Sequence, residues 1–146
     1  MISNLFILFL TSFLAGSFVP MGSEVHLLYL QSLGESLWPL LLTASIGNTF
    51  GGMSCYYIAR WGGPKLIKKY LRHDEYKIDA WVKRLSRHSE WGALFCWLPF
   101  VGEIIATALG IISSKTIKIF IFMFLGKFLR YLFISLSASA LIWFID

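Results

Sequence analysis

The chain has 146 residues, of which 57% are hydrophobic and only 14% are charged. This composition excludes an ordinary water-soluble globular domain and indicates a small integral membrane protein. The net charge of +5 does not indicate nucleic-acid binding, because 9 of the 13 Lys and Arg residues fall between Arg60 and Arg87. A basic loop that faces anionic lipid and the cytoplasm explains this distribution better.

The first apolar segments predict a helical hairpin over residues 4–34. The run "NLFILFLTSFLAGSFV" ends at Pro20, and "VHLLYLQSL" follows after Gly22 and Glu24. A helix of nine residues, the length of the second run, reaches roughly half of a ~30 Å hydrocarbon core, so it cannot span alone. A signal peptide is the less favoured alternative, because no positive charge precedes the first run.

A crossing helix is predicted over residues 37–61, with Trp38 and Trp61 at its ends as interfacial aromatic residues. Residues 62–90 place apolar side chains at helical spacing among Lys and Arg. This pattern predicts an amphipathic, basic, cytoplasmic linker.

The remaining sequence predicts a second hairpin over residues 91–113 and a second crossing helix over residues 117–145. Pro99 and Gly102 break the hairpin, and Glu103 follows the break. The crossing helix carries two basic residues near its centre, Lys127 and Arg130.

Three pairs of positions share an offset of 79 residues: Pro20 with Pro99, Glu24 with Glu103, and Gly47 with Gly126. The offset predicts an all-α integral membrane fold with two repeats, each a re-entrant hairpin followed by a crossing helix. One crossing per half places the halves in opposite orientation, with the basic linker cytoplasmic and both termini outside. The alternative has four ordinary spans, in which residues 5–33 and 91–113 are single kinked helices and both termini lie inside.

Four charged residues form the predicted site: Glu24, Glu103, Lys127 and Arg130. An uncompensated charge at mid-membrane costs about 2.5 to 3.5 kcal/mol on insertion scales, so these residues need partners or water. Hairpins that enter from opposite faces would bring their tips, formed by Pro20, Gly22, Pro99 and Gly102, to the midplane. The two acids are then expected to meet the two bases, either as a phosphate-binding and proton-accepting site or as a permanent structural brace.

Four further residues are secondary candidates. Asn48 and Thr49 lie inside Gly47-x-x-x-Gly51, a close-packing pattern, so a packing role is favoured for them. His26 is expected to line the cavity that the four charged residues share, and Arg60 begins the basic stretch. The sequence lacks Gly-x-Ser-x-Gly, His-Glu-x-x-His and Walker-type motifs, so we predict no enzyme activity, metal or cofactor.

The stretches "LAGSFVPMGSEVHL", "SIGNTFGGMSCYYIARWGG" and "WLPFVGEIIATALGIISSKTIKIFIFMFLGKFLRYL" resemble the DedA family, also called the VTT or SNARE-associated Golgi protein family, and most closely its short YqaA-like bacterial branch. The Pro-x-x-x-Glu units, "GNTxGG" and "FLGKxLRY" carry the resemblance. It implies a bacterial inner-membrane protein with two re-entrant hairpins. It also implies movement of polyprenyl phosphate or phospholipid between leaflets, with proton coupling in some relatives.

The expected function is therefore that of a lipid translocase or scramblase. Its expected partners are membrane lipids, their anionic phosphates and protons, and the sequence allows a homo-oligomer. A secondary transporter of ions or small solutes is the alternative, and a membrane-organising protein without transport activity is a third hypothesis.

Overall fold

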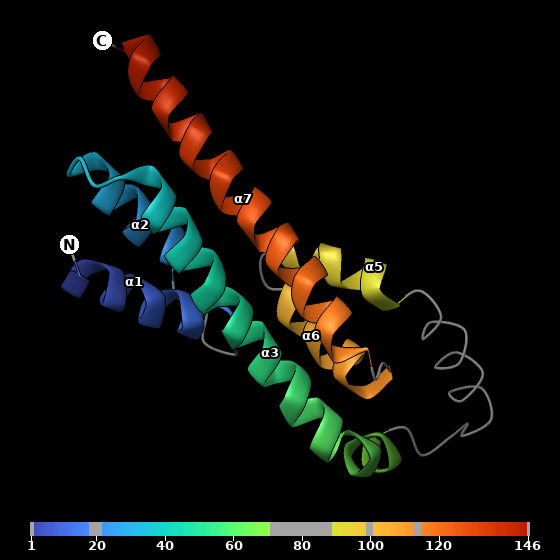
Figure 1. The fold of residues 1–146 in the computed structure, drawn as a ribbon. Coiled ribbons are helices and arrows are strands. Elements are labelled where there is room, and N and C mark those ends of the chain that lie inside the picture. Colours follow the sequence, from blue (N-terminus) through green and yellow to red (C-terminus); the bar gives the residue numbers. More distant parts are fainter. Residues whose placement is uncertain (1, 18–21, 71–88, 99–100, 113–114, 146) are drawn as a thin grey trace.

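Two long helices, α3 (Leu37–Tyr70) and α7 (Thr116–Ile145), run in opposite directions along the molecule (Figure 1). The computed structural model describes residues 2–17, 22–70, 89–98, 101–112 and 115–145. These ranges contain helices and no strands, which confirms the predicted all-α class. The shorter elements are α1 (Ile2–Ala15), α2 (Ser23–Ser32), α5 (Ser89–Leu94), the 3₁₀ turn η1 (Phe95–Trp97) and α6 (Val101–Ile112).

Helix α3 begins at the predicted residue but continues nine residues past its predicted end, to Tyr70. Pro39 falls at the third helical position, where its missing N–H removes no intrahelical hydrogen bond. The first part of the predicted linker, residues 62–70, therefore belongs to α3, and residues 71–88 of it lie outside the described residues.

The helices differ in whether they are long enough to cross a bilayer. By length and composition, Thr116–Ala140 of α7 is the one stretch within the described ranges that is long and apolar enough to cross a membrane. Helices α1 and α6 are apolar but have only 14 and 12 residues, about 21 and 18 Å at 1.5 Å per residue. Neither reaches across a ~30 Å hydrocarbon core.

A Schellman turn ends α2 and redirects the chain into α3. Gly34 adopts a φ of 82°, a left-handed conformation that glycine takes without a steric penalty. The amide of Gly34 donates to the Gln31 carbonyl at 3.0 Å, and the amide of Glu35 donates to the Leu30 carbonyl at 3.3 Å. These bonds satisfy carbonyls that the helix end would otherwise leave without donors.

Glycines bring the short helices into backbone contact with the long ones. A Cβ atom on Gly51 of α3 would lie 2.1 Å from the Phe13 carbonyl oxygen of α1, and one on Gly47 would lie 2.6 Å from that of Phe9. The predicted close-packing role of these two glycines is therefore confirmed. On the other side, a Cβ atom on Gly126 of α7 would lie 2.5 Å from the Leu94 carbonyl oxygen of α5.

The environment of the side chains repeats at the offset of 79 residues. Val25 of α2 is 72% exposed and Ile104 of α6 is 69% exposed, while Leu27 and Ala106 are both buried. The exposed faces of α3 and α7 correspond in the same way: Trp38 with Ile117, Leu42 with Ile121, Ile46 with Leu125, and Phe50 with Leu129. Equivalent positions in the two halves thus face equivalent surroundings.

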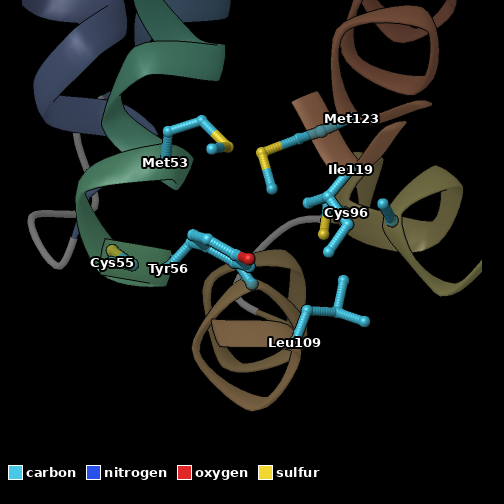
Figure 2. Close-up of a cluster of buried hydrophobic side chains, with 9 residues drawn as sticks. Met53, Cys55, Tyr56, Cys96, Leu109, Ile119 and Met123 are labelled. Atoms are coloured by element: carbon cyan, nitrogen blue, oxygen red, sulfur yellow. The ribbon is translucent and has the colours of Figure 1, made fainter. Parts of the chain in front are cut away.

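Two clusters of buried apolar side chains stabilise the arrangement. One joins α3 to α5, η1, α6 and α7 and contains Met53, Tyr56, Cys96, Leu109 and Met123 among others (Figure 2). The other joins α1, α2, α3 and α7 around Leu8, Leu27, Leu41 and Tyr131. Helices α3 and α7 contribute to both clusters, so they form the frame on which both pairs of short helices pack.

Candidate functional site

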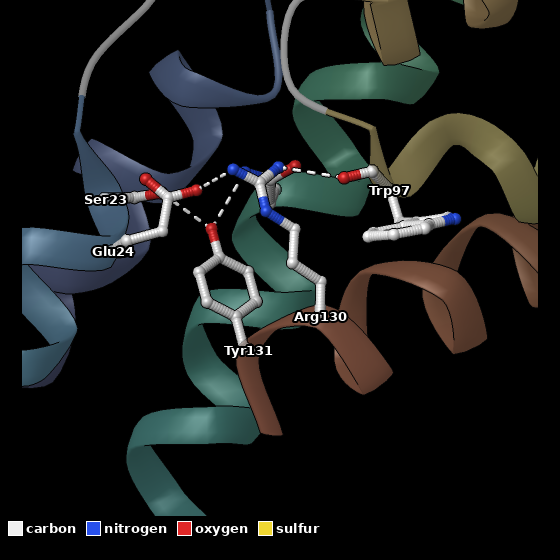
Figure 3. A network of polar contacts seen from close by, with 6 residues as sticks. Ser23, Glu24, Trp97, Arg130 and Tyr131 are labelled. Atoms are coloured by element: carbon white, nitrogen blue, oxygen red, sulfur yellow. Dashed lines mark hydrogen bonds and ion pairs between the residues drawn. The ribbon is translucent and has the colours of Figure 1, made fainter. Parts of the chain in front are cut away.

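An ion pair connects the start of α2 to the middle of α7 (Figure 3). The Nη2 atom of Arg130 donates to Oε1 of Glu24, and Nη1 donates to the backbone carbonyl of Trp97 in η1 at 3.1 Å. The two side chains are mostly buried, with 18% of Arg130 and 23% of Glu24 exposed. The guanidinium fork therefore joins elements from both predicted hairpins to one crossing helix.

The next residue of α7, Tyr131, lies at the centre of a buried hydrogen-bond network. Its hydroxyl shares a hydrogen bond of 2.6 Å with the Ser23 hydroxyl and accepts one of 2.9 Å from Nδ2 of Asn48. Ser23 precedes Glu24 in α2, so adjacent residues of α2 contact adjacent residues of α7. Asn48 brings α3 into the same network.

Lys127 is buried in α7, and no carboxylate of the described residues pairs with it. Its side chain is 3% exposed, and Nζ donates to the backbone carbonyl of Asn48 at 2.6 Å. Over the ranges that the structure covers, no carboxylate lies within ion-pair distance of this ammonium group. An ammonium group has three donors, so a single carbonyl leaves much of its hydrogen-bonding capacity unused.

Glu103, in the first turn of α6, is half-buried and makes no ion pair with any residue in the described part of the chain. It lies within electrostatic range of Lys127 and of the Cys55 and Cys96 side chains. The expectation that both acids pair with both bases is therefore wrong for Glu103. One of the two acids is paired directly, and the other lies within electrostatic range of the buried ammonium without pairing with it.

The contacts around Lys127 have a reciprocal pattern. Lys127 and Asn48 are 79 residues apart, so the two residues occupy equivalent positions and touch each other. Tyr131 and Gly52 are also 79 residues apart. Asn48 contacts Tyr131, and Lys127 correspondingly lies against Gly52, since a Cβ atom on Gly52 would lie 3.0 Å from Nζ of Lys127. Such exchange of equivalent positions is what a two-fold relation between two helices produces.

A second pair of contacts follows the same rule at the hairpins. The Ser135 hydroxyl of α7 donates to Oε1 of Gln31 in α2 at 2.6 Å. At the positions equivalent to these, Gly110 of α6 packs on Tyr56 of α3, with 2.1 Å between a Cβ atom on Gly110 and the Tyr56 carbonyl oxygen. Gly110 thus makes a close backbone contact at the place where Gln31 makes a side-chain hydrogen bond in the other half.

Comparison with known proteins gives the family of the chain. Residues 6–140 match the VTT domain, which covers most of the sequence. The chain belongs to the VTT-domain family, also called the DedA family. It is 32% identical over 142 residues to inner membrane protein YqaA of Escherichia coli (strain K12) and to that of Shigella flexneri, with 96% of this chain and 95% of each relative covered. It is 31% identical over 138 residues to an uncharacterized protein of Haemophilus influenzae, with 88% and 83% covered. No solved structure matches the chain.

The other residues predicted for this VTT-domain protein have varied positions. Pro20 and Pro99 lie outside the described residues. Gly22 precedes the first residue of α2, and a Cβ atom on Gly102 would lie 2.4 Å from the Cys96 carbonyl oxygen. Both glycines thus lie beside the first turn of the helix that carries an acid.

The secondary candidates separate into two groups. Asn48 belongs to the network around Tyr131 and Lys127, where its side-chain amide and its backbone carbonyl both bond the neighbouring helix α7. Thr49 donates to the Ser45 carbonyl at 2.7 Å within α3, His26 Nδ1 lies 3.0 Å from the Thr11 hydroxyl, and Arg60 donates to the Tyr56 hydroxyl at 2.9 Å. None of these three hydrogen bonds involves the four charged residues, whereas Asn48 contacts Lys127 directly.

Sequence reasoning missed Tyr131 and Ser23. Tyr131 is the last residue of the "FLGKxLRY" motif, and Ser23 stands next to Glu24, so adjacency to the charged residues was the available signal. Within the part of the chain that the structure describes, no group of three or more His, Cys, Asp or Glu residues is placed to hold a metal ion.

Proposed function

We propose that this VTT-domain membrane protein moves phosphate-bearing lipids between leaflets and that Lys127 and Arg130 bind the lipid phosphate. The observation that carries the proposal is the buried ammonium group of Lys127 near the middle of the apolar stretch Thr116–Ala140. A charge at that depth is costly, and one backbone carbonyl is a weak counterpart. A phosphate group would supply both the negative charge and several acceptor oxygens.

The alternative, a permanent brace, fits this geometry less well. A buried charge that serves only stability requires a close and well-paired counterion, because an unpaired buried charge is strongly destabilising. Arg130 meets that requirement through Glu24, whereas Lys127 does not. The arrangement around Lys127 therefore favours a site that an anion completes.

Arg130 gives the proposal a route to proton coupling. An incoming phosphate can take the place that Glu24 holds on Nη2 of the Arg130 guanidinium in this structure. The released carboxylate, half-buried and without its counterion, is then suited to accept a proton. In this scheme the lipid phosphate and the proton enter the site together.

The proposal includes the inverted repeat of two re-entrant hairpins. Three observations support it: the burial pattern that recurs at 79 residues, the reciprocal contacts between α3 and α7, and the short lengths of α1 and α6. In this topology the basic residues 62–90 lie in the cytoplasm of a bacterial cell, and both termini lie outside. A C-terminal reporter that is active only in the cytoplasm would contradict the topology.

The function is tested with purified protein in vesicles that contain lipids with a fluorescent label on one acyl chain. The wild type should expose inner-leaflet lipid to a membrane-impermeant quencher. Lys127→Met and Arg130→Ala should each slow this about thirtyfold or more, because each removes a charge that binds the phosphate. Lys118→Gln is the matched control, since Lys118 is an exposed base on the same helix. Uptake of a small solute without lipid movement would instead support the solute-transporter alternative.

A further inference from the structure

The two acids of the site have different neighbours at equivalent positions. The partners of Ser23 and Glu24 on α7 are Tyr131 and Arg130. Seventy-nine residues earlier than these, α3 has Gly52 and Gly51. The half of the molecule that contains Glu103 therefore has no side chain at the places from which Arg130 and Tyr131 donate.

Close packing keeps these two positions free of side chains. A Cβ atom on Gly51 would lie 2.1 Å from the Phe13 carbonyl oxygen, and one on Gly52 would lie 2.7 Å from the sulfur of Met123. Helix α3 can therefore offer Glu103 no donor from either position. No side chain in the described part of the chain pairs with this half-buried carboxylate, so it can accept a hydrogen bond from a ligand.

The chemistry of a carboxylate restricts what can fill this place. An ionised carboxylate only accepts hydrogen bonds, so its ligand must present an N–H or O–H group. A Cβ atom on Gly102, next to Glu103, would lie 2.4 Å from the Cys96 carbonyl oxygen, and one on Gly126, next to Lys127, would lie 2.5 Å from that of Leu94. The phosphate site proposed above and the acceptor site therefore share one region of the molecule. A molecule that uses both must carry a hydrogen-bond donor as well as its phosphate.

We infer that Glu103 is a specificity-determining residue that selects lipids with a hydrogen-bond donor in the headgroup. The inference rests on the proposed lipid-moving function. Ethanolamine and glycerol headgroups carry such donors, whereas the trimethylated ammonium of choline carries none. A site built to hydrogen-bond a ligand rejects an analogue that lacks the group, because its own polar atom is then left without a partner.

The test compares three lipids that differ only in headgroup. Vesicles of phosphatidylglycerol and phosphatidylethanolamine receive a trace of acyl-labelled phosphatidylglycerol, phosphatidylethanolamine or phosphatidylcholine, and the movement of each between leaflets is measured. Because the label is on the acyl chain, the signal reports lipid rather than a soluble headgroup. With wild-type protein, phosphatidylcholine should move about tenfold more slowly than the other two.

Glu103 variants assign the selectivity to this carboxylate. Glu103→Ala should bring the three rates to within about twofold of one another, mainly by slowing the two donor-bearing lipids. Glu103→Asp, which keeps the carboxylate, should retain the preference. Glu24→Ala should slow all three lipids alike, because Glu24 acts through Arg130.

The outcomes separate this inference from the function on which it rests. Equal wild-type rates for the three lipids would overturn the inference and leave lipid movement intact, as would a tenfold preference that persists in Glu103→Ala. If none of the lipids moves faster than in protein-free vesicles, the proposed function fails and the inference fails with it. If Glu103→Ala does not fold, Glu103→Met, which keeps the length of the side chain but has no carboxylate, takes its place with the same expected loss of preference.

Discussion

The two halves of the molecule share their packing but differ in their polar chemistry. Glu24 and Glu103 occupy equivalent, half-buried positions in the first turns of α2 and α6. Glu24 is paired with Arg130, whereas Glu103 is not paired with a described residue. The comparison shows that positions 79 residues apart can share a close-packed glycine, as Gly47 and Gly126 do, and a similar burial, while only one of the two long helices carries the bases of the site. The site is asymmetric because its two bases, Lys127 and Arg130, both lie on α7, whereas the equivalent positions of α3 hold Asn48 and Gly51.

The largest effect is expected from breaking the paired half. Arg130→Ala removes the counterion of a mostly buried carboxylate and should lower the free energy of unfolding by about 3 kcal/mol. The change is measured by thermal unfolding in detergent with a fluorogenic thiol reagent. The reagent reports unfolding because Cys55 and Cys96 are free thiols that are buried in the folded protein.

A variant of the unpaired half provides the control for this loss. Glu103→Gln removes the same kind of charge where no ion pair exists, so it should change stability far less than Arg130→Ala. The double variant Glu24→Gln with Arg130→Ala should be more stable than Arg130→Ala alone, since no carboxylate is then left without its partner. Equal destabilisation by Arg130→Ala and Glu103→Gln would remove the distinction between the halves.

The glycines test whether the shared packing is equivalent in energy. Gly47→Ala and Gly126→Ala each place a methyl group about 2.5 Å from a backbone carbonyl of the neighbouring short helix, at 2.6 and 2.5 Å respectively. Each should destabilise the protein by about 2 kcal/mol, because backbone cannot move aside as a side chain does. Thermal unfolding with the thiol reagent compares the two variants. Gly22→Ala, whose Cβ atom would approach nothing closer than 3.6 Å, is the control.

Much of the frame could be predicted from the sequence, because lipid imposes simple rules. Apolar runs broken by Pro and Gly located the short helices, and the start of α3 agrees with its prediction at Leu37. The end of α3 was not predictable in the same way. Pro64 and the lysines after it indicate a break, yet the helix continues to Tyr70. The local signal for a helix end at Pro64 therefore does not end α3.

The details of the site depend on packing that the sequence does not encode locally. Ser23 and Tyr131 are 108 residues apart, so their hydrogen bond could not be predicted from either neighbourhood. The Trp97 acceptor on Arg130 is a backbone carbonyl, a group that every residue carries. Glu24 is paired because α7 carries Arg130 beside it. Glu103 is not paired with a described residue, because the equivalent position of α3 is Gly51.

A smaller effect is expected from the hydroxyl at the centre of the network. Tyr131→Phe leaves the ring in its buried site but removes the partner of Ser23 and Asn48, so it should destabilise the protein by about 1.5 kcal/mol. In a double-mutant cycle, Ser23→Ala should cost less in the Tyr131→Phe background than in the wild type. Additive losses, measured by thermal unfolding, would show that the two hydroxyls do not interact. Tyr57→Phe, at a partly exposed tyrosine of α3, is the matched control.

The smallest effect concerns the polar contacts that lie near the helix ends of each half, outside the predicted membrane-spanning segments. In the first half, Nδ2 of Asn4 donates to Oε1 of Glu35 at 3.0 Å, and in the second, Nζ of Lys115 pairs with Oε2 of Glu90 at 2.9 Å. The hydrogen bond from Lys115 holds the pKa of the Glu90 carboxyl below its ordinary value of 4.5. The pair therefore stabilises the fold above pH 4.5 and loses this contribution as the pH falls through the lowered pKa.

Accordingly, Glu90→Gln should be slightly less stable than the wild type at pH 7, and the difference should shrink below pH 4.5, as measured by tryptophan fluorescence during thermal unfolding. A difference that instead grows on acidification would mean that Glu90 is destabilising as a carboxylate, and the two halves would then differ at their ends as well as at their centre.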